Sequence, residues 1–328
     1  MALTFTDARA GSFPMGQQSH WTEADIPDLT GRTVVITGAN TGLGLQAALV
    51  LAARGARLVL ACRNADKAGR AADQIATAAN GAAPSVVRLD LASQSSVRAA
   101  AKEIRDRFPP LDLLINNAGV MEVPYQRTED GFELTLATNH LGPFALTGLL
   151  LDRLAAGARI VTMSSIGHLE GVVNVDDLQS ERGYDPDQAY GQSKLANLLF
   201  TYELDRRLRA AGAAVTALAC HPGVVYTDLF ANRSPFQQFL LSPPMRLINF
   251  WAVQNVRMGA LPVLRAATDP SARGGDYFGP RRTGLRRRFY TGYPAVVESS
   301  ARSHDEASQA WLWRTSEQLT GAVYPALS

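Results

Sequence analysis

Tyr190 and Lys194 have residue types and a spacing that could carry out proton transfer. They lie four positions apart in a segment, 188–211, whose composition favours a helix, so both side chains should point the same way. A tyrosine with an ordinary pKa of about 10 is a poor proton donor or acceptor at neutral pH. A neighbouring ammonium stabilises the phenolate and lowers that pKa. The pair could therefore give a proton to a carbonyl oxygen or take one from an alcohol.

The turn TGANTGLG at 37–44 has the composition of a phosphate-binding loop. Gly38, Gly42 and Gly44 permit a tight turn and a close approach of backbone to phosphate. A helix beginning near Leu43 would direct its first N–H groups and the positive end of its dipole at the same place. Glycines alone are weak evidence, but this turn follows an apolar strand and opens a helix. We therefore expect a dinucleotide here, and the other expected contacts in the turn are Asn40, Thr41 and Leu43.

Arg63, in LACRN after the second apolar run, bears on the choice of cofactor. A protein that binds NAD usually has Asp or Glu there, which binds the ribose 2′-hydroxyl. A guanidinium is a better partner for a 2′-phosphate. The sequence therefore predicts NADP(H), with Asn64 and Lys67 as helpers. The alternative is that Arg63 is a solvated residue at a helix entry, and its position favours the cofactor role.

Asp90 and Leu91, in LDLAS at 89–93, follow the third apolar run. The Asp90 carboxylate could accept a hydrogen bond from the adenine amino group, with Leu91 as a backbone contact. Asp90 could equally cap the helix that follows. The sequence leaves both interpretations open.

A regular alternation of strands and helices should position these residues. Apolar runs lie at 33–37, 56–62, 85–89, 111–116, 158–164 and 214–220, and helical segments lie at 43–55, 64–79, 94–107, 131–155 and 188–211. This alternation predicts βαβ units, and strands that are apolar throughout are typical of a parallel sheet covered on both faces. We expect one doubly wound (Rossmann) α/β domain of about seven strands, with helices on both faces and the last strand near Asp276–Phe278.

The chain divides into three parts. Residues 1–31 are polar and aperiodic and form an N-terminal arm that could lie on the surface or reach a partner subunit. Residues 32–280 form the Rossmann domain. Residues 281–328 form a C-terminal extension packed on the same domain, with an amphipathic helix at 305–321 that carries Trp311 and Trp313.

Composition excludes several other classes of protein. The 328 residues are 46% hydrophobic and 19% charged and carry a formal net charge of +2, which does not suggest a nucleic-acid binder. Two cysteines are too few for a disulfide framework, and the histidines lack the spacing of a metal site. The sequence shows neither a secretory signal nor an apolar run of about 20 residues. We therefore expect a cytoplasmic protein with no transmembrane segment and no metal.

Six motifs resemble those of the short-chain dehydrogenase/reductase family. They are TGANTGLG (37–44), NNAG (116–119), TNHLGPF (138–144), SS (164–165), YGQSK (190–194) and HPG (221–223), and they occur in the family's order. Within the family the chain is most similar to the retinol-dehydrogenase-like branch, which includes relatives of the WW-domain oxidoreductase. ACRN (61–64), VNVDDL (173–178) and SKLANLLF (193–200) carry that finer resemblance.

The resemblance implies roles for individual residues. Ser165, or failing it Ser164, would hydrogen-bond the substrate oxygen. Lys194 would also bind the nicotinamide ribose, and Asn139 would hold a water that links Lys194 to solvent. Without the Tyr–Lys pair, a turn-forming serine and a helix-interior amide would be the simpler interpretations of Ser165 and Asn139. Further cofactor contacts are expected from Asn116, Asn117, Ala118 and Gly119 near the adenosine, and from Pro222, Gly223, Val225 and Thr227 near the nicotinamide.

Segment 224–256 follows the sixth strand, where ligands bind in doubly wound folds. Its apolar content suggests a lid over a lipophilic substrate, and the expected contacts are Phe230, Phe236, Phe239 and Trp251. A subunit interface or a membrane-surface contact would also explain it. His168, soon after Ser165, could line the substrate entrance or be a loop residue without a role.

The sequence thus predicts an NADP(H)-dependent oxidoreductase that interconverts a lipophilic ketone or aldehyde and its alcohol, with Tyr190 as general acid and base. The alternatives are a non-catalytic NADP(H)-binding regulator, or double-bond reduction or epimerisation on the same scaffold. A homodimer or homotetramer is expected through the helices at 131–155 and 188–211, unless the lid and tail block that contact.

Overall fold

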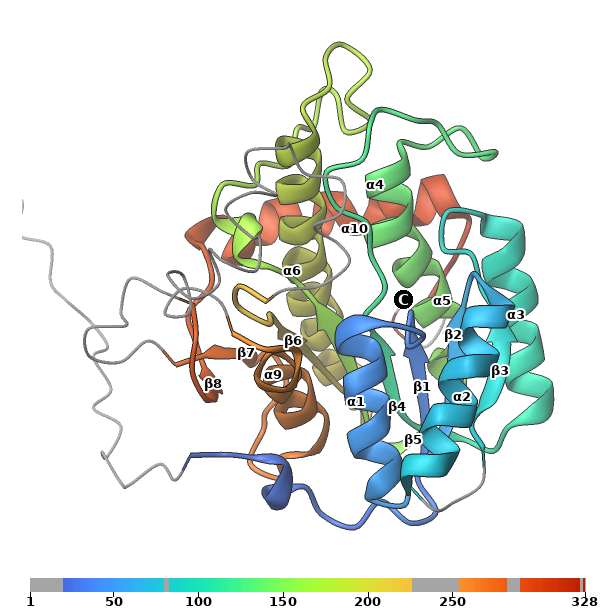
Figure 1. Ribbon diagram of the computed structural model, residues 1–328. Coiled ribbons are helices and arrows are strands. Elements are labelled where there is room, and N and C mark those ends of the chain that lie inside the picture. Colours follow the sequence, from blue (N-terminus) through green and yellow to red (C-terminus); the bar gives the residue numbers. More distant parts are fainter. Residues whose placement is uncertain (1–19, 80–82, 226–253, 282–289, 325–326, 328) are drawn as a thin grey trace, which may run out of the picture.

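The computed structural model describes residues 20–79, 83–225, 254–281, 290–324 and 327, which form a sheet between two layers of helices (Figure 1). The sheet has eight strands in the order β3-β2-β1-β4-β5-β6-β7-β8. They are β1 (Thr33–Thr37), β2 (Arg57–Cys62), β3 (Ser85–Arg88), β4 (Leu111–Asn116), β5 (Leu154–Met163), β6 (Thr216–Cys220), β7 (Tyr277–Pro280) and β8 (Pro294–Val296). The first seven are parallel and β8 is antiparallel to β7. The predicted doubly wound sheet is confirmed, with one strand more than expected.

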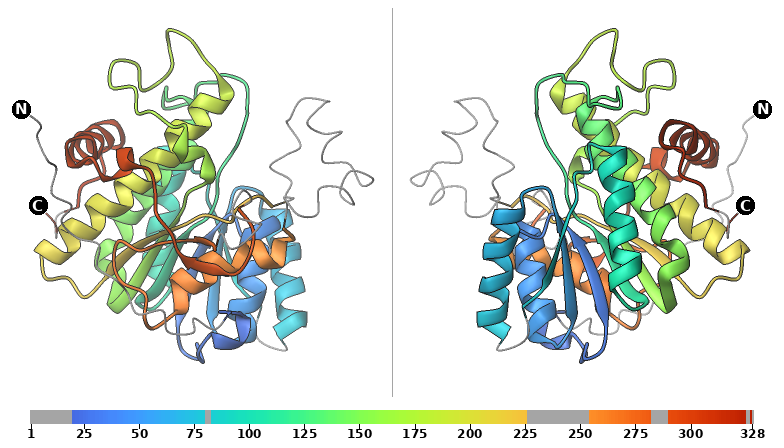
Figure 2. Two further views of the ribbon diagram at one scale, coloured as in Figure 1. Left: turned by 90° about the vertical axis from the view of Figure 1, so that its left-hand side faces the viewer. Right: turned by 90° about the vertical axis from the view of Figure 1, so that its right-hand side faces the viewer.

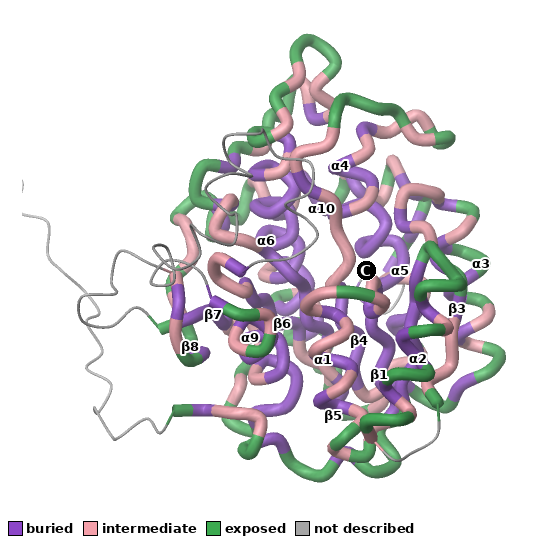
Figure 3. The backbone as a smooth tube through the Cα atoms, viewed as in Figure 1, coloured by how far each residue is buried: buried purple, intermediate pink, exposed green. Residues whose placement is uncertain are grey.

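Helices cover both faces of the sheet. On one face lie α1 (Gly42–Ala53), α2 (Ala65–Ala79) and α9 (Val256–Thr268); on the other lie α3 (Gln94–Arg107), α5 (Gly142–Leu150) and α6 (Pro186–Ala210). Successive residues of a strand enter opposite cores: Val34 and Ile36 pack in one cluster and Val35 in the other. This two-sided burial explains why the buried stretches of the central strands are mostly apolar (Figure 3).

The predicted helical stretch at 131–155 is found over residues 134–153, but it is not one regular α-helix. The structure has a short α4 (Leu134–Leu136), a π-helical turn (Ala137–Leu141), α5 and a 3-10 turn (Leu151–Arg153), and β5 begins immediately afterwards. A π turn inserts one extra residue, and such turns often occur at functional sites. A pattern of apolar residues does not reveal it, because the π turn is as buried as the helices around it.

The helical stretch Leu134–Arg153 is the one among the described residues with the length and apolar content to cross a membrane. Of its most apolar window, 78% is buried inside the protein. Its apolar side chains therefore contact the sheet and neighbouring helices, as expected of a core helix.

The described part of the N-terminal arm packs on the body of the fold. Trp21, Ile26 and Leu29 are buried in the core cluster that contains α1 and α9, and the Glu23 carboxylate pairs with Arg257 at 2.6 Å. Residues 20–31 thus pack against the domain, although their sequence shows no periodic pattern of apolar residues.

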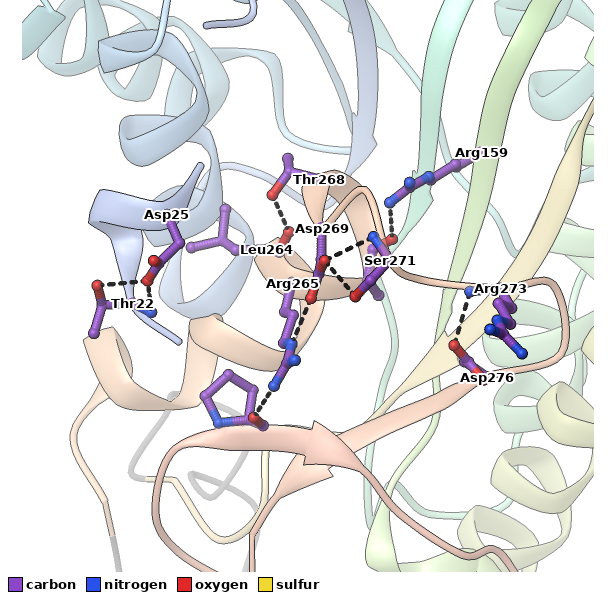
Figure 4. A network of polar contacts seen from close by, with 12 residues as sticks. Thr22, Asp25, Arg159, Leu264, Arg265, Thr268, Asp269, Ser271, Arg273 and Asp276 are labelled. Atoms are coloured by element: carbon purple, nitrogen blue, oxygen red, sulfur yellow. Dashed lines mark hydrogen bonds and ion pairs between the residues drawn. The ribbon is translucent and has the colours of Figure 1, made fainter. Parts of the chain in front are cut away.

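Strand β8 has the short Pro-Ala-Val sequence, which is why the sequence did not predict it. Arg265 of α9 holds it in place by donating to the Pro294 carbonyl at 2.6 Å. Asp269, just after α9, accepts from the same guanidinium at 2.8 Å and fixes its orientation (Figure 4). Because β8 pairs with the free side of β7, it covers that edge and is the last strand of the sheet.

The predicted C-terminal helix is confirmed as α10 (Glu306–Thr320), which lies outside α5 and α6 (Figure 2). Trp313 is 2% exposed and sits among aromatic rings of Phe144, Phe200 and Tyr324. The Tyr324 hydroxyl donates to the Phe144 carbonyl at 2.6 Å. The extension therefore covers part of the helix surface that the predicted oligomer contact would use.

We predict that Trp313→Ala lowers the free energy of unfolding by about 3–5 kcal/mol, because it leaves a cavity between α10 and the body. Urea denaturation followed by circular dichroism measures this loss. Trp311→Ala is the matched control, since Trp311 is only partly buried, and it should cost clearly less. Equal losses in the two variants would contradict the packing described for α10.

Candidate functional site

A cavity of about 960 Å³ opens at the carboxyl ends of the central strands. Parallel strands bring residues far apart in sequence to this edge, and the strand order changes direction between β1 and β4. The predicted residues that line it are Gly38, Asn40, Thr41, Gly42, Leu43, Gly44, Arg63, Asn64, Asp90, Leu91, Asn117, Ala118, Gly119, Ser165, Tyr190, Lys194, Pro222, Gly223 and Val225. One concave site thus gathers motifs spread over most of the chain.

The glycine turn is shaped by close backbone contacts. Gly38 has a φ of +66°, and a Cβ there would lie 2.8 Å from the Ala118 Cβ. A Cβ on Gly44 would lie 2.6 Å from the Gly38 carbonyl oxygen and 2.5 Å from the Asn117 amide nitrogen. Thr41 precedes α1 without making a side-chain cap. The turn is therefore tight, and it leads into a helix end suited to an anion.

Polar side chains from β2 and β3 line the next part of the cavity. Arg63 is exposed at the end of β2. Asn64 accepts the Lys67 N–H at 2.8 Å and so caps α2, and Lys67 also lines the cavity. The Asp90 carboxylate accepts the Ala92 N–H at 3.0 Å, so Asp90 stabilises its own turn while facing the cavity.

Lys194 brings a positive charge into the interior. Its side chain is 4% exposed, its Nζ donates to the Met163 carbonyl at 3.3 Å, and it lies 5.5 Å from the centre of the Tyr190 ring. Burial lowers the pKa of Lys194 from 10.5 to about 8, which leaves most of the population protonated at pH 7. A cation therefore stands beside the tyrosine ring, as the i, i+4 spacing predicts.

The two serines after β5 have different surroundings. Ser164 is 1% exposed and donates its hydroxyl proton to the Lys194 carbonyl at 2.8 Å. The Ser165 hydroxyl lines the cavity and accepts the Gly167 N–H at 3.2 Å, which leaves its proton for donation. A Cβ on Gly167 would lie 3.3 Å from the Tyr190 ring, so glycine lets serine and tyrosine approach each other. This geometry favours Ser165 over Ser164 as the substrate contact.

Asn139 lies in the π turn beneath the cavity and is not part of the wall. Its Oδ1 accepts the Val120 N–H at 2.7 Å, and its Nδ2 donates to the Val120 carbonyl and the Ser193 hydroxyl, each at 2.9 Å. The amide thus ties the segment after β4 to α6, as a backbone-satisfying amide would. A role in holding water stays a prediction.

Some predicted residues lie elsewhere. Asn116 is buried and donates to Thr147 at 3.0 Å. His168 is 2% exposed and is absent from the cavity wall, so the structure does not support it as a substrate contact. Most of the predicted lid 224–256, with Thr227, Phe230, Phe236, Phe239 and Trp251, lies outside the described residues.

Sequence reasoning also missed part of the wall. The additional lining residues are Ala61, Cys62, Leu89, Val120, Met121, Glu122, Thr138, Met163, Ile166, Gly167, Leu169, Glu170, Asp187, Gln188, Val224 and Tyr290. Eleven of these sixteen residues lie inside a quoted motif or within two positions of one, and that proximity was the available signal. Tyr290 comes from the segment before β8, and no motif in the sequence pointed to that segment.

We predict that the free energy of unfolding of Lys194→Met exceeds that of the wild type at pH 7 by on the order of 2 kcal/mol, because the substitution removes a buried charge. The unfolded chain keeps the Lys194 proton up to pH 10.5, whereas the folded protein releases it near pH 8. Above pH 10.5 the Lys194 amine is neutral in both states, so its burial carries no charge penalty. As the pH falls through 8, the folded protein has to bury an ammonium, and the wild type loses that stability. The advantage of the variant should therefore shrink between pH 8 and 10.

Urea unfolding at several pH values measures this difference. A variant that is less stable than the wild type at pH 7, or an advantage that grows with pH, would contradict the burial of a charged Lys194.

Comparison with known proteins gives a consistent result. A family model described as short chain dehydrogenase matches residues 32–238. Retinol dehydrogenase 13 from Homo sapiens is 40% identical over 310 residues, which cover 93% of this chain and 88% of that protein. Retinol dehydrogenase 12 from Mus musculus is 42% identical over 304 residues, which cover 92% of this chain and 89% of that protein.

Solved structures show the same fold. An uncharacterized protein from Mycobacterium Paratuberculosis has a TM-score of 0.77 and 43% identity, covering 94% of this chain and 100% of its own. A short chain dehydrogenase from Burkholderia cenocepacia J2315 in complex with NADP has a TM-score of 0.60 and covers 76% of this chain and 96% of its own. At 22% identity, the second likeness supports the fold alone.

Proposed function

Because the chain belongs to the short-chain dehydrogenase/reductase family, in its retinol-dehydrogenase-like branch, we propose that it is an NADP(H)-dependent oxidoreductase. It would interconvert a lipophilic ketone or aldehyde and the corresponding alcohol. The observation that carries the proposal is one cavity with the glycine turn and Arg63 in one part of its wall and Ser165, Tyr190 and Lys194 in another.

The residues present fit a phosphorylated dinucleotide. A side chain at Gly38 or Gly44 would meet neighbouring atoms at under 3 Å, so the turn keeps its surface as bare backbone. Arg63 and Lys67 supply two cations after β2, where a 2′-phosphate would be bound. Lys194 would bind the nicotinamide ribose. When bound, NADP(H) supplies or accepts the hydride.

The chain's own residues handle the proton. In carbonyl reduction, Tyr190 donates its phenolic proton to the oxygen of the substrate, and Ser165 donates a hydrogen bond to the same oxygen. In alcohol oxidation the direction reverses and Tyr190 takes the proton. The Lys194 ammonium favours the phenolate in both directions because it stabilises negative charge in a buried site. Asn139 holds the backbone at Val120 and thereby fixes the floor of the cavity.

A lipophilic substrate is supported by the wall around Ser165 and Tyr190. Val120, Met121, Ile166 and Leu169 line the cavity beside polar residues of the same segments, Glu122 and Glu170, and Leu169 is 42% exposed at its surface. Apolar pockets with a few convergent polar groups select apolar ligands and orient their polar atoms. The names of the related retinol dehydrogenases fit this class, and we propose a neutral, mainly hydrocarbon carbonyl compound or alcohol.

We predict that Tyr190→Phe lowers kcat about 10²- to 10⁴-fold, because it removes the proton donor and keeps the ring. NADPH oxidation is measured with a panel of lipophilic aldehydes and ketones, and the Kd of NADPH is measured by fluorescence. The Kd should stay within about threefold of the wild type, since the change removes one hydroxyl. A Tyr190→Phe variant with wild-type turnover would refute the assigned chemistry, and NADPH binding without turnover in any form would favour a regulator.

We predict that Arg63→Asp weakens NADPH binding on the order of 10- to 100-fold and leaves NADH binding equal or tighter. The carboxylate repels a 2′-phosphate and can accept from a 2′-hydroxyl. Arg70→Asp is the matched control, because Arg70 is also exposed on this side of the fold but does not line the cavity. Equal losses in both variants would show only a general charge effect.

A further inference from the structure

His168 lies directly behind the catalytic wall. It belongs to the 3-10 turn Ile166–Leu169 that Ser165 begins, and it is 2% exposed. Its Nδ1 is 2.6 Å from the Ser165 carbonyl oxygen, and its Nε2 is 3.2 Å from the Ser300 backbone nitrogen. The imidazole thus connects Ser165, which lines the cavity, to Ser300 of the C-terminal extension, 132 positions after His168.

The two partners determine how the ring must be protonated. A carbonyl oxygen only accepts, so Nδ1 must carry the proton that it donates to Ser165. A backbone N–H only donates, so Nε2 must present a lone pair to Ser300. A neutral ring protonated at Nδ1 satisfies both bonds, whereas an imidazolium would lose the bond to Ser300. Burial lowers the pKa of His168, which favours the neutral ring.

The rest of the surroundings are compatible with this tautomer. The Tyr277 hydroxyl lies 3.4 Å from Nδ1, and its ring meets the imidazole edge-on at a centroid distance of 5.5 Å. Because Ser165 lies at 2.6 Å, it is the nearer acceptor for the Nδ1 proton.

These bonds act on the orientation of Ser165. Its carbonyl oxygen accepts from the His168 ring and, at 3.1 Å, from the His168 backbone N–H. Its hydroxyl oxygen accepts the Gly167 N–H at 3.2 Å. With both oxygens held, the serine has little freedom to turn its hydroxyl away from the cavity. Loss of the ring bond would leave this carbonyl held by the His168 backbone N–H alone, and would thereby loosen the peptide between Ser165 and Gly167.

We propose that His168 is a positioning residue for Ser165, and that the Ser300 backbone of the C-terminal extension holds the imidazole in the tautomer this requires. The inference rests on the proposed function, since it acts through the hydrogen bond from Ser165 to the substrate oxygen. It assigns to His168 a role behind the wall in place of a contact with substrate.

Two substitutions separate the two bonds of the ring. In His168→Asn, the amide nitrogen can take the place of Nδ1 and donate to the Ser165 carbonyl. In His168→Gln, the longer side chain can reach the place of Nε2 and accept from Ser300, but the donor to Ser165 is lost. His304→Gln is the matched control, because His304 is exposed in the same C-terminal segment and bonds Ser299.

We expect His168→Gln to lower kcat about 10-fold, the size of one lost hydrogen bond. His168→Asn should retain most of the activity, His304→Gln should equal the wild type, and the Kd of NADPH should not change in any of them. In a Ser165→Ala background, neither substitution at His168 should lower kcat further, because its effect passes through Ser165. If the His168 substitutions lower kcat by the same factor in the wild type and in the Ser165→Ala background, the proposal is overturned and His168 is a purely structural residue.

The arms distinguish this inference from the proposed function. If Ser165→Ala alone turns over like the wild type, the role of Ser165 is refuted and the inference falls with it. If Ser165→Ala is impaired but the His168 effects are additive with it, only the inference fails.

A measurement independent of activity tests the tautomer. The protein is labelled with ¹⁵N-histidine, and the NMR signals of the His168 ring are identified by their absence in His168→Gln. They should show a protonated Nδ1 and an unprotonated Nε2. Protonation at Nε2 would contradict the two hydrogen bonds on which the inference depends.

Discussion

The hydrogen bond from the buried Lys194 ammonium to the Met163 carbonyl, 3.3 Å long, is the constraint around which the site is organised. A charge removed from water must be hydrogen-bonded, or the group loses its proton. The Met163 carbonyl lies at the carboxyl end of β5 and also accepts from Asn197, one turn further along α6, at 3.0 Å. In the opposite direction, Ser164 donates to the Lys194 carbonyl. These bonds fix α6 against β5, and Tyr190 and Ser165 follow from that placement.

The C-terminal extension supports the same site from behind. Ser316 of α10 hydrogen-bonds His140 at 2.8 Å, in the π turn that also holds Asn139. Ser300 bonds His168 behind Ser165, and Tyr290 forms part of the cavity wall. A segment that follows the last parallel strand thus contributes a lining residue and two supports. The extension therefore contributes to the candidate site and also covers α5 and α6.

The sequence predicted most of what depends on local pattern. Apolar runs and glycine turns located seven strands. Residues on both faces of a buried strand are apolar, and tight turns favour glycine because it adopts backbone angles that other residues avoid. The i, i+4 spacing placed Lys194 beside Tyr190. What failed depends on distant partners: β8 forms because Arg265 and β7 hold a short segment, and Trp21, Ile26 and Leu29 are buried by elements remote in sequence. The hydrogen bond between His168 and Ser300 was equally hidden, because the two residues are 132 positions apart.

The central claim is that the cavity supports hydride transfer to a carbonyl carbon, with the proton supplied by Tyr190. It is tested most directly by reducing a lipophilic α,β-unsaturated ketone with NADPH that carries deuterium at both C4 positions of the nicotinamide. The label in the product is then located by mass spectrometry and NMR. The account predicts one deuterium on the carbinol carbon and an exchangeable hydrogen on its oxygen. Label on a carbon of a former C=C bond, or alcohol formed without label, would contradict it.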